Sequence, residues 1–329
     1  MKYGKKSNII ERFKKDKVIN KVYYYLKPFI PRALQIAMRR KIVSMKRKKY
    51  SHIWPILESS RKPPKEWTGW PNNKKFAVVL THDVDTQKGH DKCELLLELE
   101  NEIGFRSSFN FVPQRYGVSS ELLRFITDKG FEVGVHGLIH DGKLYNSREI
   151  FKERAKLINS YLRKWNSVGF RSPAMHHNLE WIHDLDILYD ASTFDTDPFE
   201  PQSDGVATIY PFWVVNSMTN SAYVELPYTL CQDFTLFIIM QEKNINIWKR
   251  KVDWIVKNGG MVLVNTHPDY MNFDTNKTGL EEYPAKYYEE LLIFIQKRYS
   301  QEYFCALPKE IAEFFAKSFP LKQNYLKHS

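Results

Sequence analysis

The sequence predicts an α/β fold: a distorted (β/α) barrel of seven to eight units, preceded by a basic helical N-terminal extension. From residue 76 onward, short apolar runs alternate with helical patterns, which is typical of parallel strands joined by helices. The number of these units favours a barrel over an open sheet. Ionisable residues follow several of the apolar runs, where the strands of such a barrel end and its chemistry is found.

The N-terminal arm, residues 1–53, carries most of the positive charge. Residues 1–50 contain 17 Lys and Arg against Glu11 and Asp16, a net charge of +15, so the remaining residues carry −4 of the total of +11. Residues 8–26 and the stretch after them have amphipathic, basic patterns. Such an arm fits an anionic membrane surface, and a solvated arm is the competing interpretation. Nucleic acid is not favoured, because nothing else resembles a recognition module.

Three further segments follow the arm. Residues 54–75 contain four prolines and three tryptophans, which indicates an ordered connector that wraps onto the next domain. Residues 76–320 form the predicted catalytic domain, and residues 321–329 a tail.

The predicted strands are apolar runs rich in β-branched and aromatic residues. They are 76–81, 107–112, 131–136, 168–172, 187–192, 222–228, 260–267 and 303–307. The predicted helices show apolar residues at helical spacing. They are 90–103, 119–129, 147–165, 178–186, 245–258, 281–298 and 308–317.

The expected compartment is the cytoplasm. The basic arm adds the expectation of peripheral attachment at the inner membrane face. The three cysteines are widely spaced and odd in number, which argues against a disulfide framework. The N-terminus has charges but no apolar signal core, and no run of about 18 apolar residues occurs.

Two motifs carry metal and acid–base chemistry. In THDVD, Asp83 and Asp85 lie two positions apart, so on an extended segment they point the same way. In HGLIH, His136 and His140 lie four apart, which in a helical turn puts both imidazoles on one face. Two histidines and one aspartate are a good zinc set, and the second carboxylate would serve as a proton acceptor. Strand-end aspartates also cap loops, and histidine pairs also occur without a metal.

These motifs, together with FRSP and NTHP in the same order along the chain, resemble the polysaccharide deacetylases of the NodB-homology type, carbohydrate esterase family 4. THDVD resembles the first motif with one residue inserted between its acids, as in the DxD subset. The resemblance implies Asp83 as general base and Asp85, His136 and His140 as ligands of a divalent metal. Zinc is the expected ion, and cobalt or nickel would fit the same set.

The resemblance also implies roles for residues around this centre. Arg171 would orient the base, and His267 would act as general acid. Pro173, in the third motif, would contact substrate, and Leu263 and Val264 would line an acetyl pocket. The fourth motif departs from the family pattern, and among Asp190, Asp195 and Asp197 we expect Asp195 to be the charge partner of His267. His176 lies in a loop where it would contact substrate.

The sequence therefore predicts a metal-dependent hydrolase that removes an N-acetyl group from an amino sugar of a glycan or lipid-linked saccharide. Two alternatives stay open. One is a metal-dependent hydrolase of a small amide or cyclic imide, a substrate class found among intracellular DxD relatives. The other is a non-catalytic protein that keeps the deacetylase-like fold for assembly or binding.

Overall fold

The structure is a computed structural model that describes residues 30–274 and 279–321. The amphipathic stretch predicted at 8–26 and nearly all of the predicted tail lie outside the described residues.

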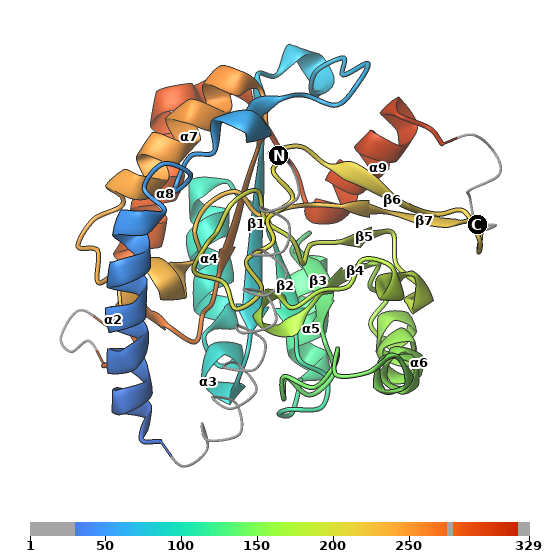
Figure 1. Ribbon diagram of the computed structural model, residues 1–329, viewed down its shortest axis with the longest axis horizontal. Helices are drawn as coiled ribbons and strands as arrows, with labels where there is room; N and C mark the ends of the chain where they lie inside the picture. The colour runs from blue at the N-terminus through green and yellow to red at the C-terminus, as the bar shows by residue number, and fades with distance from the viewer. Residues whose placement is uncertain (1–29, 275–278, 322–329) are drawn as a thin grey trace, which may run out of the picture.

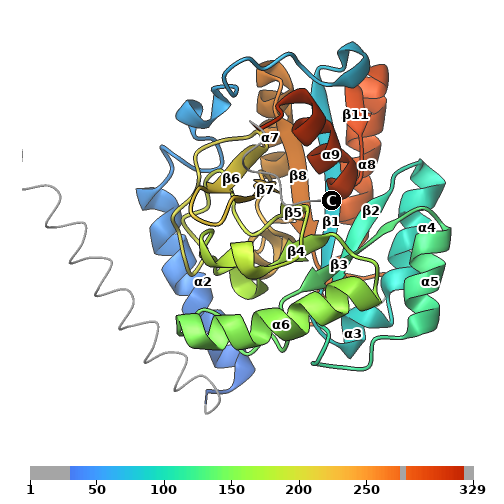
Figure 2. The same cartoon turned by 90° about the vertical axis from the view of Figure 1, so that its right-hand side faces the viewer.

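A single curled sheet forms the centre of the molecule, with helices packed around it (Figures 1 and 2). Its strand order is β11-β1-β2-β3-β4-β5-β7-β6, and β8 pairs with β1. The strands of this sheet are β1 (Phe76–Val84), β2 (Ser107–Phe111), β3 (Glu132–His136), β4 (Gly169–Arg171), β5 (Tyr189–Asp190), β6 (Phe212–Asn216), β7 (Ser221–Glu225), β8 (Met261–Thr266) and β11 (Tyr303–Cys305). All eight predicted strands are present, and β6 is an additional strand that forms an antiparallel hairpin with β7.

Strand β1 is the axis of the sheet. Residues 77–82 of β1 pair with β8 along one edge. Along the opposite edge, residues 76–78 pair with β11 and residues 80–84 pair with β2. Isolated bridges join Phe194 to Tyr228 and Leu230 to Val264, so the segment after β7 connects the β5 side to β8. The sheet therefore curls into the distorted barrel that the strand–helix alternation predicts.

The helices mostly match the predicted segments. Those that cover the sheet are α3 (Gln87–His90), α4 (Cys93–Ile103), α5 (Ser120–Asp128), α6 (Arg148–Lys164), α7 (Asn246–Asn258), α8 (Lys286–Tyr299) and α9 (Pro308–Ser318). The helix predicted at 178–186 is wrong: that segment forms only a 3-10 turn, η5 (Trp181–Asp184). The helix predicted at 281–298 begins at Lys286, because β10 (Tyr283–Pro284) first pairs with β9 (Met271–Asn272).

Short helical turns and a π-helix complete the chain. They are η2 (Glu58–Arg61), η3 (Pro71–Asn73), η4 (Pro173–Met175), the π-helix η6 (Phe234–Ile239) and η7 (Ser300–Glu302). None of the helices in the described residues is long and apolar enough to cross a bilayer.

Side chains alternate between the barrel interior and the helix layer along each strand. On β1, Val78 and Leu80 belong to the apolar cluster beneath the helices, whereas Ala77 and Val79 belong to the cluster inside the barrel. Residues of α9 also pack into the interior cluster. Because the carboxyl end of β1 continues this alternation, Thr81 and Asp83 face inward.

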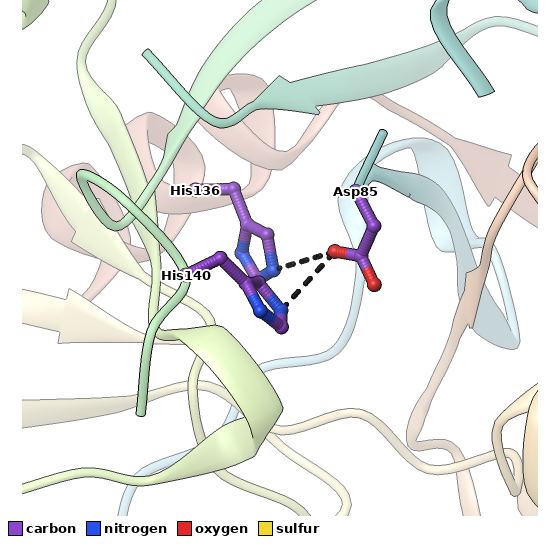
Figure 3. Close-up of side chains that lie close together, drawn as sticks. All are labelled: Asp85, His136 and His140. Atoms are coloured by element: carbon purple, nitrogen blue, oxygen red, sulfur yellow. Dashed lines mark ion pairs between the residues drawn. The ribbon is translucent and has the colours of Figure 1, made fainter. Parts of the chain in front are cut away.

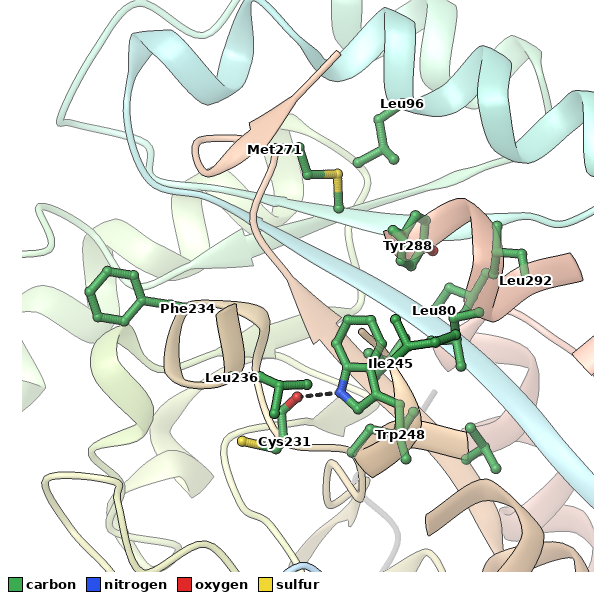
Figure 4. Close-up of a cluster of buried hydrophobic side chains, with 14 of the residues drawn as sticks. Leu80, Leu96, Cys231, Phe234, Leu236, Ile245, Trp248, Met271, Tyr288 and Leu292 are labelled. Atoms are coloured by element: carbon green, nitrogen blue, oxygen red, sulfur yellow. Dashed lines mark hydrogen bonds between the residues drawn. The ribbon is translucent and has the colours of Figure 1, made fainter. Parts of the chain in front are cut away.

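The largest apolar cluster lies between the sheet and helices α4, α7 and α8 (Figure 4). Trp248 of α7 is fully buried there, and its indole N–H donates a hydrogen bond of 2.7 Å to the carbonyl of Cys231. This bond ties α7 to the segment that precedes η6 and carries part of the site described below.

The arm and the connector pack against the barrel wherever the structure describes them. Helix α2 (Arg32–Lys49) runs alongside the domain (Figure 1), and its Arg40 donates to the carbonyl of Ile238 in η6. In the connector, Trp54 and Trp70 are buried, and the indole N–H of Trp70 donates to the carbonyl of Gly259.

Truncation of Trp248 is expected to destabilise the fold strongly. Trp248→Ala creates a large cavity and should lower the free energy of unfolding by about 3–5 kcal/mol. Trp248→Phe keeps most of the packing but leaves the Cys231 carbonyl without its donor, which should cost about 1–3 kcal/mol. Urea unfolding measures both, with the exposed Leu157→Ala on α6 as control. A Trp248→Ala protein as stable as this control would contradict the packing.

Candidate active site

Asp83 and Asp85 lie at the carboxyl end of β1, and both carboxylates face His136. Asp85 Oδ1 lies 3.4 Å from His136 Nε2, and Asp83 Oδ2 lies 3.9 Å from the same atom. The predicted spacing rule for an extended segment therefore holds. The backbone N–H of Asp85 donates to Asp269 at 2.9 Å, and Asp269 also accepts from the Thr86 hydroxyl. Asp269 thus fixes the loop that presents Asp85.

His136 and His140 converge through a loop, so the helical turn expected for HGLIH is wrong. His136 ends β3, and the chain then turns through positive φ at Gly137 and His140. A Cβ at Gly137 would lie 2.4 Å from the ring of Pro173, so only glycine fits this turn without displacing Pro173. His140 Nε2 reaches 3.2 Å from Asp85 Oδ1.

Three donor atoms of Asp85, His136 and His140 surround one point (Figure 3). They all lie within 4.8 Å of one another. The Nδ1 of His136 contacts the carbonyl of Arg171 at 3.1 Å, and a carbonyl accepts only from an N–H, so in the neutral imidazole the Nε2 atom presents a lone pair toward Asp85. Asp85 Oδ1 is buried and accepts no hydrogen bond within the described chain. Lone pairs that face one another in a buried place fit a cation between them.

Asp83 is buried and held by neutral and charged donors. Its Oδ1 accepts from Asn110 at 3.0 Å, its Oδ2 accepts from Asn265 at 2.8 Å, and Arg171 Nε lies 3.4 Å from Oδ1. Burial raises the pKa of Asp83, but the charges of His136, Arg171 and His267 outweigh burial and lower this pKa below its usual value. The carboxylate is therefore ionised at neutral pH.

Asp85 is more strongly biased toward its ionised form. Burial raises the pKa of Asp85, but in the metal-free protein the positive charge of His140 and the N–H groups that both histidines present when protonated bring this pKa well below its usual value. A carboxylate oxygen next to two imidazoles is a donor set that borderline divalent ions such as zinc accept.

His267 follows β8 and is paired with Asp233. His267 Nδ1 lies 2.7 Å from Asp233 Oδ1, and the His267 backbone N–H donates to Oδ2 at 2.8 Å. Asp233 also caps η6 through the Phe234 N–H and accepts from the Tyr283 hydroxyl. Four donors therefore fix this one carboxylate, which in turn fixes His267.

Asp233 keeps His267 protonated. Burial lowers the pKa of His267, but the Asp233 carboxylate, its hydrogen bond and the charges of Asp85 and Asp83 raise this pKa to about 10. This value lies well above the ordinary histidine pKa of 6.5. The difference arises because three carboxylates face one buried imidazole.

The prediction that Asp195 lies beside His267 is wrong. Asp195 is buried and paired with Lys251 of α7, whose Nζ lies 2.5 Å away. Lys251 also donates to the carbonyl of Pro55, and Ser60 contacts Asp195, so this buried pair anchors the connector. A buried lysine needs a carboxylate partner, and the sequence did not indicate which aspartate would supply it.

The predicted substrate contacts divide into two groups. Pro173 is buried against Gly137, next to the turn between the two histidines. Burial and the charge of His177 lower the pKa of His176, and the charge of His140 adds to this effect, which places His176 near the site. Leu263 faces the barrel interior but is fully buried two residues below Asn265. Val264 faces the opposite way, into the helix-side cluster, so its predicted place in an acetyl pocket is wrong.

His82 alternates with Asp83 along β1 and faces away from the metal ligands. Its ring nitrogens contact Thr266 Oγ1 at 2.7 Å and Glu100 Oε1 at 2.9 Å, and both of its partners are buried. Because Thr266 precedes His267, this contact joins the ends of β1 and β8 behind the site.

The sequence missed two of the amides that hold the site, Asn110 and Asn265. Both lie inward on their strands, and Asn265 stands within the NTHP motif, so the inward alternation of β8 was the available signal. Gln232, beside Asp233, accepts from Asn265 at 3.4 Å and donates to Glu200 at 2.6 Å.

A scan against protein families and a search of curated proteins find no match for this chain. Solved structures do match. A protein from Mycobacterium smegmatis assigned as a polysaccharide deacetylase shares 18% identity at a TM-score of 0.59, covering 79% of this chain and 96% of its own. A second, from Pseudomonas aeruginosa PAO1, shares 16% identity at 0.58, covering 77% and 95%. PuuE allantoinase shares 14% identity at 0.56, covering 77% and 94%.

At such identities the likeness establishes the fold. This chain has the fold of the polysaccharide deacetylases, the distorted barrel that its motifs predicted. The activity is a separate inference from the residues at the rim of that barrel.

His267 of the metal-free protein is expected to titrate far above an ordinary histidine. Asp233→Asn removes the facing charge, so its pKa should fall toward the usual 6.5. The folded-state pKa is the raised one, so the pair stabilises the fold fully below about pH 6.5 and loses that effect as pH rises through about 10. Histidine NMR titration measures this, with Asp253→Asn as control. An unchanged His267 pKa in Asp233→Asn would rule out the pairing.

Proposed function

We propose that this protein is a metal-dependent hydrolase that removes an N-acetyl group from an amino sugar of a glycan or lipid-linked saccharide in cell-surface polysaccharide biosynthesis. One observation carries the proposal: a His₂Asp donor set lies beside an ionised carboxylate, Asp83, and a protonated imidazole, His267, whose pKa is raised by the charges of both aspartates. These are the groups that hydrolysis of an amide requires.

Asp85, His136 and His140 would hold the ion, most simply zinc, with cobalt or nickel as alternatives. When bound, the metal supplies Lewis acidity, which polarises a carbonyl and makes water more acidic. The residues fit the ion because Asp85 Oδ1 has no hydrogen-bond donor and the His136 tautomer leaves Nε2 free.

Asp83 would accept the proton from the attacking water. Its two oxygens accept from Asn110 and Asn265, which fixes the orientation of the carboxylate, and Arg171 keeps it ionised. Arg171 is itself positioned by its 3.0 Å hydrogen bond to the Thr81 hydroxyl. A base held ionised and oriented in this way is ready without reorganisation.

His267 would donate a proton to the departing nitrogen. Its Nδ1 is held by Asp233, so the free Nε2 is the atom that delivers the proton. Water thereby adds its oxygen to the acyl carbon, the C–N bond breaks, and acetate and an amine are released. The protonated state of His267 fits a general acid rather than a base.

The basic N-terminal extension supports a lipid-linked substrate. The expected place of action is the cytoplasm at the inner membrane face, where anionic lipid attracts basic helices. This part of the proposal rests on charge and not on the site.

A second candidate is hydrolysis of a small amide or cyclic imide. It is supported by the residue inserted between Asp83 and Asp85 and by the fold similarity to PuuE allantoinase. Assays with N-acetylated hexosamine oligosaccharides and with small cyclic imides separate the two: turnover of the imide alone would replace the first proposal by the second.

Metal content should depend on the three ligands. Asp85→Ala and His136→Ala should each lose the ion that the purified protein carries, because two donors remain where zinc needs at least three protein ligands. Elemental analysis measures this, with the exposed Asp204→Ala as a matched control. Stoichiometric metal in both variants would overturn the assignment.

Asp83→Asn should retain the metal but lose turnover by about 10²–10⁴-fold, because it removes the proton acceptor. The amide preserves the shape of the side chain, so circular dichroism should be unchanged. Turnover and metal content are measured on the same sample. Activity equal to that of the unchanged protein would refute the role of Asp83 as base.

A further inference from the structure

Helix α2 packs on the domain through the buried Ile36 and Val43, flanked by basic residues, and leaves a second apolar face exposed. The helix has eight Lys and Arg and no acidic residue. On the side that faces the domain, Arg40 donates to the carbonyl of Ile238, Lys46 donates to the carbonyl of Pro198, and Arg47 pairs with Glu242. These contacts fix the rotation of the helix, and with it the residues that point outward.

The outward side carries a stripe of large apolar side chains, which we call the α2 stripe. It consists of Leu34, Met38, Ile42 and Met45, exposed by 52%, 43%, 46% and 60%. Their spacing of four, four and three residues keeps them on one face. Four of the eleven exposed large apolar side chains in the described residues lie on this one helix. Such a concentration marks an interaction surface.

Lysines surround the α2 stripe. Lys41, Lys48 and Lys49 are exposed and lie on the same side of the helix, whereas the other basic residues contact the domain. The outward face therefore combines flexible apolar side chains with positive charge and carries no acidic residue. That combination is complementary to lipid headgroups above an apolar layer, because lysine stems can lie along the apolar surface while their ammonium groups reach the phosphates.

We propose that the outward face of α2 is a docking surface for an anionic lipid bilayer, with the α2 stripe buried at the headgroup boundary and the three lysines on phosphates. A second copy of this chain fits less well, since two-fold pairing would bring the same lysines against one another. Nucleic acid offers phosphates but leaves the stripe exposed.

Docking would place the candidate active site beside the bilayer. The first half of α2 lies at the carboxyl end of the barrel, where Arg32 pairs with Glu281 and the Arg39 guanidinium lies 5.0 Å from the centre of the Phe234 ring. Phe234 directly follows Asp233, the partner of His267. Substrates anchored in the membrane would then reach the active site without leaving the bilayer. This consequence rests on the proposed function.

Vesicle sedimentation of the full chain tests the docking itself. We expect binding to vesicles of phosphatidylglycerol and phosphatidylcholine, weakened by salt, and little binding to phosphatidylcholine alone. Serine at all four positions of the α2 stripe should weaken binding by about tenfold or more, and Lys→Gln at the three lysines should remove the preference for anionic vesicles. Leu157→Ser with Met218→Ser, exposed apolar sites elsewhere at 46% and 83%, should bind like the unchanged chain.

The readout is independent of any hydrolytic activity, so failure of the proposed function would not affect it. Circular dichroism checks that the serine variant folds, and Met45→Asp alone provides a milder second variant. Unchanged binding by the stripe variants would overturn the proposal. A full chain that ignores anionic vesicles but forms a dimer broken by the same substitutions would overturn it as well, in favour of a second copy.

Discussion

Two carboxylates close together at the end of one strand are the constraint on which this site depends. Asp83 is buried and the side chain of Asp85 is only 13% exposed, and like charges so placed repel strongly unless cations approach them. Arg171 and His267 supply charge on the Asp83 side, and His136 and His140 approach Asp85. Oxygen and nitrogen donor atoms of Asp85 and the two imidazoles surround one point, and a metal ion there would compensate the charge of Asp85.

The same two carboxylates determine which partners the residues around them need. The cationic His267 requires its own counter-charge, which Asp233 supplies while also capping η6. The carboxylate of Asp83 is oriented by amides, which add hydrogen bonds without adding charge. His267 and Asp83 therefore differ in protonation state because carboxylates surround the first and cations the second. The pKa of His267 is raised and that of Asp83 is lowered, as a proton donor and a proton acceptor in amide hydrolysis require.

The N-terminal extension belongs to this architecture as far as the structure describes it. The buried Asp195–Lys251 pair holds the connector, and α2 packs on the domain through Ile36 and Val43 and donates from Arg40 to η6. A helix that is fixed on one side and apolar on the other is a rigid platform, whereas a loosely attached basic arm would present no defined face. The position of the site relative to any bound surface then follows from the fold.

The sequence by itself determined the alternation of strands and helices, the eight barrel strands and the residues at their ends, because apolar periodicity and local spacing act over a few residues. It also indicated Asp83, Asp85, His136 and His140, whose motifs are local. Only the tertiary structure decided that Asp233 pairs with His267 and that Asp195 pairs with Lys251. Nothing local distinguishes these aspartates: each finds its partner through the registry of strands and helices far apart in the chain. Val264 faces outward for the same reason, since the register of β8 against β1 sets which side chains enter the barrel.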